Sequence, residues 1–140
     1  MNIKRIILIS ILLWIVNAIL GQLTCGWLFN WVYQIPPMIW KTAEEIIQTK
    51  NMIGINIIGL MHVSLFTLVY AILYKGLPGK KIKKAFIYAI LVWLVGALPG
   101  IASMPFYMTI STTVIIYWLI QALIFGIIDG LILGALYKGK

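Results

Sequence analysis

Four stretches of the chain are almost continuously apolar, and short polar segments separate them. The stretches cover residues 6–25, 53–74, 85–104 and 111–137. Each matches the roughly 20 residues that an α-helix needs to cross the hydrocarbon core of a bilayer. Backbone groups in lipid must be hydrogen-bonded within the segment, so we expect helices. The pattern predicts an all-α polytopic membrane protein with four transmembrane helices, in a single membrane domain over residues 1–140.

The two halves of the chain repeat each other. An offset of 79 aligns "ILLWIVNAILG" (11–21) with "ILVWLVGALPG" (90–100), and an offset of 63 aligns "YAILYKG" (70–76) with "LGALYKG" (133–139). We interpret the repeat as two tandem helical hairpins, repeat 1 over residues 1–76 and repeat 2 over residues 80–140. Two crossings return the chain to its starting side, so a pseudo-twofold axis along the membrane normal would relate the hairpins.

Composition supports a membrane protein. The chain is 63% hydrophobic and 10% charged, with a mean hydropathy of +1.05, whereas soluble domains are about half apolar and about a quarter charged. The N-terminal apolar run resembles a signal peptide, but it is too long for one and lacks a cleavage site. We therefore interpret it as the first transmembrane helix.

Positive charges gather on one predicted side of the membrane. That side carries Lys4, Arg5, Lys75, Lys80, Lys81, Lys83, Lys84, Lys138 and Lys140, and the other side only Lys41 and Lys50, offset by Glu44 and Glu45. The bias predicts cytoplasmic N- and C-termini in the cell inner (plasma) membrane. Topology and anionic headgroups explain the net charge of +8, so we expect the lipid bilayer as a partner and no nucleic acid.

The longest polar connection, residues 26–51, is predicted to be an outer interfacial segment. Its aromatic residues, Trp27, Trp31, Tyr33 and Trp40, suit the membrane–water interface. From Pro37 onward, apolar residues recur at the spacing of a short amphipathic helix, at Met38, Ile39, Ala43, Ile46 and Ile47. Such a helix would lie in the plane of the surface.

Small residues form stripes that indicate close helix packing. On the first helix the stripe is Ser10, Asn17, Gly21 and Thr24, and its counterpart on the third is Ala89, Gly96, Gly100 and Ser103. On the fourth helix Ala122, Gly126, Gly130 and Gly134 recur every four residues. Small residues let membrane helices approach closely, so we expect these faces to pack inside the bundle or against another chain. Asn17 stands where the repeat has a glycine, which predicts a hydrogen bond to a neighbouring helix or, alternatively, a ligand contact.

Asp129 and His62 are the main candidates for chemistry. Asp129 is the one acidic residue inside a predicted span, where a charge is costly and usually functional. The repeat alignment places His62 about one turn from it in depth, so the two would pair if both faced inward. The pair would be a structural hydrogen bond, a proton-relay or transport site, or a cofactor contact. Asn17 and Gln121 complete this set of polar residues.

Few other residues suit catalysis or metal binding. One cysteine, Cys25, and one histidine are too few for a convincing metal site or an intramolecular disulfide. We find no serine or cysteine catalytic constellation. The sequence therefore predicts no enzyme, no catalytic residue, no metal and no cofactor.

Two segments carry a resemblance to other proteins. They are "LFNWVYQIPPMIW" (28–40) and "LYKGLPGKKIKKAFIYAILVWLVGALPG" (73–100). Through them the chain resembles small uncharacterised bacterial four-span membrane proteins of the domain-of-unknown-function type. The resemblance covers most of the chain and implies no particular activity.

Two hypotheses for function follow. The first is a non-enzymatic structural or accessory subunit that forms helix–helix assemblies, as a homo-oligomer or with another membrane protein, through its small-residue faces. The second is a small transporter or ion- or proton-conducting oligomer that uses Asp129 and His62.

Overall fold

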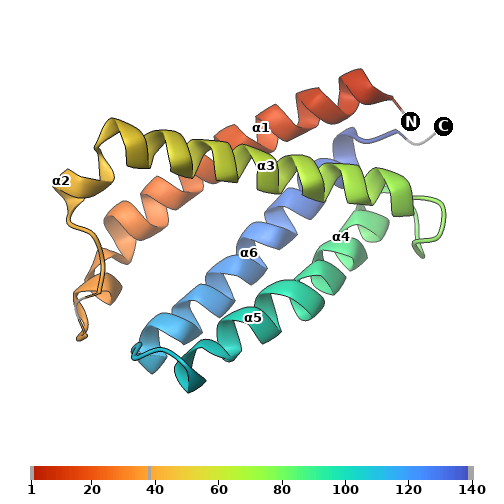
Figure 1. Ribbon diagram of the computed structural model, residues 1–140. Coiled ribbons are helices and arrows are strands. Elements are labelled where there is room, and N and C mark those ends of the chain that lie inside the picture. Colours follow the sequence, from red (N-terminus) through yellow and green to blue (C-terminus); the bar gives the residue numbers. More distant parts are fainter. Residues whose placement is uncertain (1, 38, 139–140) are drawn as a thin grey trace.

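The chain folds into four long helical segments joined by short connections (Figure 1). The computed structural model describes residues 2–37 and 39–138, and that part of the chain contains no β-strand. Four helices are long and apolar enough to cross a membrane, Ile3–Leu28, Thr49–Leu73, Lys81–Phe106 and Thr112–Leu136. The predicted all-α fold with four helices that could span a membrane is thereby confirmed. Met38, Gly139 and Lys140, used in the sequence-based predictions, lie outside the described residues.

The first and third spans are not uniform α-helices. The first consists of α1 (Ile3–Gly21) and a π-helical turn (Gln22–Leu28), followed by a 3₁₀ segment (Asn30–Gln34). The third consists of α4 (Lys81–Val92), a π-helical turn (Trp93–Ala97), α5 (Leu98–Ala102) and a 3₁₀ turn (Met104–Phe106). Pro99 lacks a backbone N–H and its ring collides with the preceding turn of a regular helix. The π-turn directly before Pro99 accommodates both effects.

The second and fourth spans are single α-helices, α3 (Thr49–Leu73) and α6 (Thr112–Leu136). The Ser111 hydroxyl accepts a hydrogen bond from the backbone N–H of Thr113 at the start of α6. Capping of this kind satisfies a backbone donor that has no partner within the helix.

The outer connection is less helical than the sequence predicts. The expected amphipathic helix from Pro37 is limited to α2 (Ala43–Ile46), which is a single turn. Thr42 has extended backbone angles and forms a capping box with Glu45, so the helix starts only after it. The connection is also shorter than residues 26–51, since the first span continues to Leu28 and α3 begins at Thr49.

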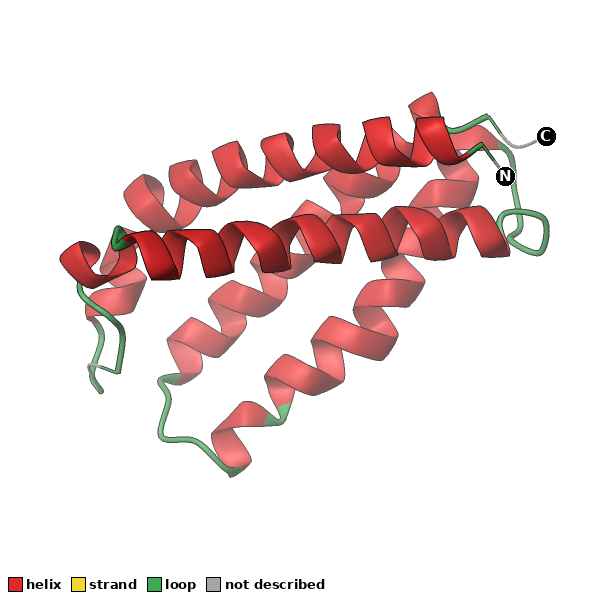
Figure 2. Cartoon of the chain, turned by 45° about the horizontal axis from the view of Figure 1, so that its top comes forward, coloured by secondary structure: helices red, strands yellow, loops and turns green. Residues whose placement is uncertain are grey.

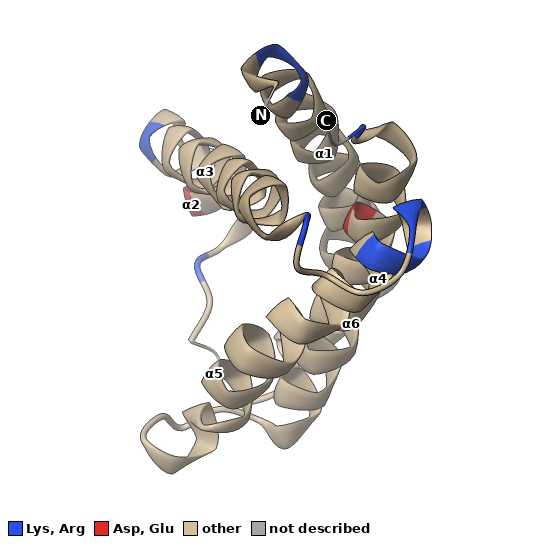
Figure 3. Ribbon diagram, turned by 90° about the vertical axis from the view of Figure 1, so that its right-hand side faces the viewer, with Lys and Arg blue, Asp and Glu red and all other residues tan. Residues whose placement is uncertain are grey.

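The helices pair as two consecutive hairpins. α1 packs along α3, and α4 packs along α6, while α1 also contacts α6. The N-terminus, the α3–α4 connection and the C-terminal end of α6 all lie at one end of the molecule (Figure 1). Most of the lysine and arginine residues lie there as well (Figure 3), so we call it the basic end. The opposite end, with residues 29–48 and 103–111, is the outer-loop end.

Near the basic end the two hairpins are joined through α3 and α4. An aromatic cluster fills that junction, with ring centroids 4.9–5.6 Å apart between neighbours; its members are Phe66, Tyr70, Tyr74, Tyr88 and Tyr137. The Tyr88 hydroxyl donates a 2.7 Å hydrogen bond to the Phe66 carbonyl and so ties α4 to α3. From this junction α3 and α4 separate toward the outer-loop end (Figure 1, Figure 2).

Candidate functional site: a cleft between the hairpins

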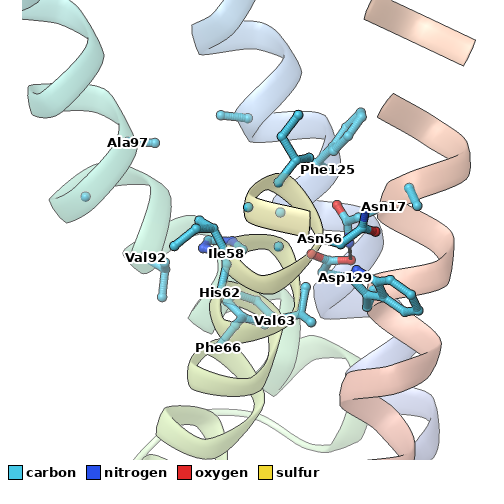
Figure 4. Close-up of a pocket in the computed structure, with 18 of the residues that line it drawn as sticks. Asn17, Asn56, Ile58, His62, Val63, Phe66, Val92, Ala97, Phe125 and Asp129 are labelled. Atoms are coloured by element: carbon cyan, nitrogen blue, oxygen red, sulfur yellow. Dashed lines mark hydrogen bonds between the residues drawn. The ribbon is translucent and has the colours of Figure 1, made fainter. Parts of the chain in front are cut away.

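A cavity of about 1180 Å³ lies where the hairpins separate, and we call it the cleft. All four spans line it (Figure 4). Its walls are mainly apolar, with aromatic side chains from each span: Trp14, Phe66, Trp93 and Phe125. Concave apolar sites that hold a few polar groups are typical of binding sites in proteins.

Asp129 is the most deeply buried polar group in the wall of the cleft. Its residue is only 3% exposed, and the Asn17 amide donates a 2.7 Å hydrogen bond from Nδ2 to Asp129 Oδ1. The same Nδ2 also donates a 2.9 Å hydrogen bond to the Leu13 carbonyl, one turn earlier in α1. This second bond fixes the direction of the amide. Within the described residues, no donor bonds to Asp129 Oδ2.

The structure does not bring His62 and Asp129 into the expected pair. Both residues line the cleft, but Asp129 bonds to Asn17, and no hydrogen bond or ion pair joins it to His62 among the described residues. His62 lies with Ile58 on the side of α3 that faces Val92, whereas Asp129 lies against α1 (Figure 4). The two side chains therefore belong to opposite walls of one cavity.

Gln121 lies outside the cleft, in a polar cluster nearer the outer-loop end. Its Nε2 donates hydrogen bonds to Thr24 Oγ1 at 2.8 Å and to Cys25 Sγ at 3.0 Å. Tyr33 also donates to Cys25 Sγ, at 3.4 Å, and accepts a 3.0 Å hydrogen bond from Trp118 Nε1. Burial and the contact with Cys25 raise the pKa of Tyr33, so its phenol remains a neutral donor. Gln121 therefore joins α6 to the π-helical turn of the first span.

The glycine stripe of α6 divides between two environments. A Cβ at Gly130 would lie 2.9 Å from the Ala85 carbonyl oxygen, and one at Gly134 would lie 2.7 Å from Ile82 Cα. These glycines therefore permit the close contact of α6 with α4. Gly126 and Ala122 line the cleft instead, and a Cβ at Gly126 would meet no atom within 4 Å outside its own helix.

The other predicted packing glycines have no close neighbour. A Cβ at Gly21, Gly96 or Gly100 would meet no atom within 4 Å. Gly96 lines the cleft, opposite the α1 wall that carries Asn17, whereas Gly21 and Gly100 lie outside it. The stripes of the first and third helices are thus packed only in part: Ser10 and Ala89 are buried, whereas these three glycines are open.

Sequence reasoning missed the polar mouth of the cleft. Lys41, Lys50 and Asn51 line its outer edge, and Lys41 Nζ donates a 2.9 Å hydrogen bond to Asn51 Oδ1. The first two had been counted only for orientation. The one sequence signal for these three residues is that Asn51 shares a helix face with the other cleft residues of α3. This face can be recognised only after the structure shows which side of α3 lines the cleft.

The described residues contain no group of three His, Cys, Asp or Glu side chains that would hold a metal ion. The single carboxylate of the cleft therefore offers charge and hydrogen bonding rather than a metal-ligand set.

No protein-family model, curated protein or solved structure matches the chain. Its function is therefore inferred from the geometry of the cleft.

Proposed function

We propose that the chain is a non-enzymatic accessory subunit of the plasma membrane, which binds a transmembrane segment of another membrane protein in the cleft. The observation that carries this proposal is the unfilled lining of small residues. Gly54, Gly96 and Gly126 line the cleft from three different spans, and none has an atom within 4 Å of its Cβ position. Glycine in a membrane helix usually marks a close helix contact.

The contrast within α6 supports the same proposal. Gly130 and Gly134, four and eight residues further along the stripe, are buried against α4. One half of the stripe thus makes the contact that its spacing predicts, and the other half faces an open cavity. A helix supplied by another chain would complete the second half in the same way.

A photocrosslinking experiment tests this function with two adjacent positions. Ile57 and Ile58 are 60% and 58% exposed, but only Ile58 lines the cleft. A photoreactive amino acid at Ile58 should yield a discrete protein adduct in native membranes, whereas the matched Ile57 variant should yield lipid adducts. Identical lipid adducts at both positions would contradict the proposal.

The proposal includes a membrane orientation with both termini and the α3–α4 connection in the cytoplasm. The concentration of lysine and arginine at the basic end supports it (Figure 3). In a Cys25→Ser background, a membrane-impermeant maleimide should label Ile47→Cys on intact spheroplasts and Ile82→Cys only after permeabilisation. Both positions are well exposed, so labelling on the same side would refute this topology.

We further propose that one ancestral hairpin was duplicated and that a pseudo-twofold axis relates the halves. Burial supports this: under the sequence offsets, six equivalent pairs are buried in both hairpins. The pairs are Ile6/Ala85, Ile9/Tyr88, Ser10/Ala89, Phe66/Asp129, Thr67/Gly130 and Tyr70/Leu133. Equivalent burial indicates equivalent packing faces, as two copies of one hairpin would have.

A second function is favoured by one observation: Asp129, Asn17 and His62 all line the same cleft. A small transporter or proton-conducting oligomer would place its polar groups in this way. Purified protein in liposomes would then show proton- or solute-dependent flux that Asp129→Asn abolishes. Absence of flux together with a cleft-specific adduct at Ile58 would favour the accessory subunit.

A further inference from the structure

We infer that the occupant of the cleft is a transmembrane helix of a different polypeptide, with a lysine or arginine that pairs with Asp129. This inference rests on the proposed accessory function and names the chemistry of the partner. Three features of the cleft carry it: its length, its small-residue walls and its incompletely bonded carboxylate.

The cleft is elongated along α3. On α3 its lining runs from Lys50 to Phe66 with members in every turn, and at 1.5 Å per residue this distance is about 24 Å. That length covers most of a hydrocarbon core about 30 Å thick. The volume of about 1180 Å³ spread over this length gives a mean cross-section of roughly 50 Å², which suits one side of a helix inserted between the hairpins. A compact organic cation would occupy only a part of it.

The walls allow a helix backbone to approach closely. Beside its aromatic residues the cleft presents small ones from all four spans: Ala18, Gly54, Gly59, Gly96, Ala97, Ala122 and Gly126. Association between membrane helices depends on such close packing because lipid supplies no hydrophobic driving force. A helix therefore gains more from these walls than a flexible lipid chain would.

The carboxylate requires a positive charge that this chain does not supply. Asp129 is 3% exposed and bonds only to the Asn17 amide among the described residues, whereas an ionised carboxylate accepts up to about four hydrogen bonds. The two basic side chains of this chain that could pair with Asp129 have other positions or partners. Lys84 bonds to the Tyr74 carbonyl and lies over the Tyr74 ring, and His62 belongs to the opposite wall.

A second copy of the chain does not fit this requirement. Every lysine and arginine of the described residues lies in a connection or within four residues of a span end. Asp129 lies seven residues inside α6, at about 10 Å from its C-terminal end. Lys84 comes nearest to this depth, because the Ala85 carbonyl next to it lies beside Gly130. Lys84 is buried and bonds to the Tyr74 carbonyl, so it does not extend toward a second copy. Buried intramembrane charges usually pair with one another. The charge complementary to Asp129 therefore comes from a different membrane protein, with a basic residue about two turns from the cytoplasmic end of its helix.

Synthetic helices test this inference with the full-length protein in phospholipid nanodiscs. The probes are Leu/Ala transmembrane peptides that differ at one position at the depth of Asp129, with lysine, leucine or glutamate there. Binding is measured by energy transfer from a donor dye at the C-terminus of the protein to an acceptor on the peptide. We expect the lysine peptide to bind about ten-fold more tightly than the leucine peptide, as one or two interhelical polar contacts would give, and the glutamate peptide to bind most weakly.

Variants of the carboxylate separate charge from packing. Asp129→Asn keeps the shape and a hydrogen-bond acceptor and should abolish the preference for lysine, whereas Asp129→Glu should retain it. Thermal unfolding of each variant in detergent checks that it is folded. Equal binding of the lysine and leucine peptides to the wild-type protein would overturn the inference while leaving the accessory function intact.

Two further outcomes separate the remaining possibilities. The accessory function itself fails if no peptide binds and if Gly126→Leu leaves the crosslinking at Ile58 in native membranes unchanged. If tetraphenylphosphonium binds in a manner that depends on Asp129 and no peptide does, the cleft holds a lipophilic cation and the inference is overturned. A matched control is Gly100→Leu, because Gly100 also has open space at its Cβ position but lies outside the cleft; this variant should bind the lysine peptide as the wild type does.

Discussion

Replacing Gly134 with alanine should destabilise the second hairpin, whereas the same replacement at Gly126 should not. Both glycines lie in α6 on one stripe. A Cβ at Gly134 would lie 2.7 Å from Ile82 Cα and 2.9 Å from Ala85 Cβ, and both neighbours belong to α4. Carbon atoms pack best at about 3.5–4.0 Å, so α4 would have to move away from α6 by about an ångström. A Cβ at Gly126 would meet no such neighbour.

Two opposing terms give the size of the effect. Alanine is more favourable than glycine inside a helix by about 1 kcal/mol, and this gain applies at both positions. Overpacking of a close contact costs about 1–3 kcal/mol, and this cost applies only at Gly134. The propensity gain therefore cancels in the difference between the variants. We expect the free energy of unfolding of Gly134→Ala to be about 1–3 kcal/mol below that of Gly126→Ala.

Reversible unfolding in mixed micelles provides the measurement. Dodecyl sulfate is titrated into protein in a mild detergent, and circular dichroism follows the loss of helix. Wild type, Gly126→Ala and Gly134→Ala are compared under the same conditions, with tryptophan fluorescence as a second probe. Equal stability of the two variants, within about 0.5 kcal/mol, would refute the close α4–α6 contact, since additive single-site effects are reproducible to about that value.

Three further predictions follow from single contacts. Asn17→Leu removes the hydrogen bond to Asp129 and should cost about 1–3 kcal/mol of stability; the double variant with Asp129→Leu should recover part of that loss in the same dodecyl sulfate titration. Hydrogen bonds from the backbone N–H and the hydroxyl of Thr42 lower the pKa of Glu45. The capping box therefore stabilises α2 at neutral pH and is lost as the pH falls through the lowered pKa of Glu45. NMR titration of the Glu45 carboxyl should show a pKa below that of a free glutamate, and Thr42→Ala should bring it closer to the free value. Gly79 has a φ of +91°, so Gly79→Ala should cost about 1 kcal/mol in thermal unfolding.

The four spans could be predicted from the sequence because hydropathy alone determines which segments partition into lipid. The ends of the helices were harder to predict from the sequence. The first span continues through the π-turn to Leu28, three residues beyond the predicted end at Cys25, and its hydrogen bonds rather than its hydropathy mark the end. In the outer connection, the local cap formed by Thr42 and Glu45 outweighs the apolar spacing that predicts a longer helix from Pro37.

The polar residues of the cleft could be predicted individually but not as a set of contacts. Asp129 was singled out by the cost of a charge in a span, and Asn17 by the glycine at the equivalent position of the repeat. Counting residues along each helix places Asn17 about 21 Å from the start of α1 and Asp129 about 10 Å from the end of α6. Their hydrogen bond therefore requires the two helices to be tilted or displaced along their axes, which no pattern within one helix encodes.

Rotation about the helix axis explains the other errors. The repeat alignment fixes the depth of His62 relative to Asp129, but depth does not determine the direction in which either side chain points. In the same way, a four-residue spacing identifies the stripe on α6 without showing that Gly130 and Gly134 contact α4 while Gly126 faces the cleft. Packing between helices sets these directions, and in membranes it depends on shape rather than hydrophobicity.

Differences between equivalent positions of the two hairpins explain why the cleft should accept a foreign helix. Under the proposed duplication, Phe66 is equivalent to Asp129 and Gly96 to Asn17, and all four residues line the cleft. The α1 and α6 side of the cleft thus carries a carboxylate and the amide that orients it. The two flanks differ from it, since α3 contributes a phenyl ring and the third span an open glycine. An occupant inserted between these flanks has a basic residue toward α1 and α6 and apolar sides toward α3 and the third span. In an isologous contact a basic residue of each copy would have to reach Asp129 of the other. The lysine and arginine residues of the described chain lie in connections or within four residues of a span end, so such a contact would leave each carboxylate without a counter-charge.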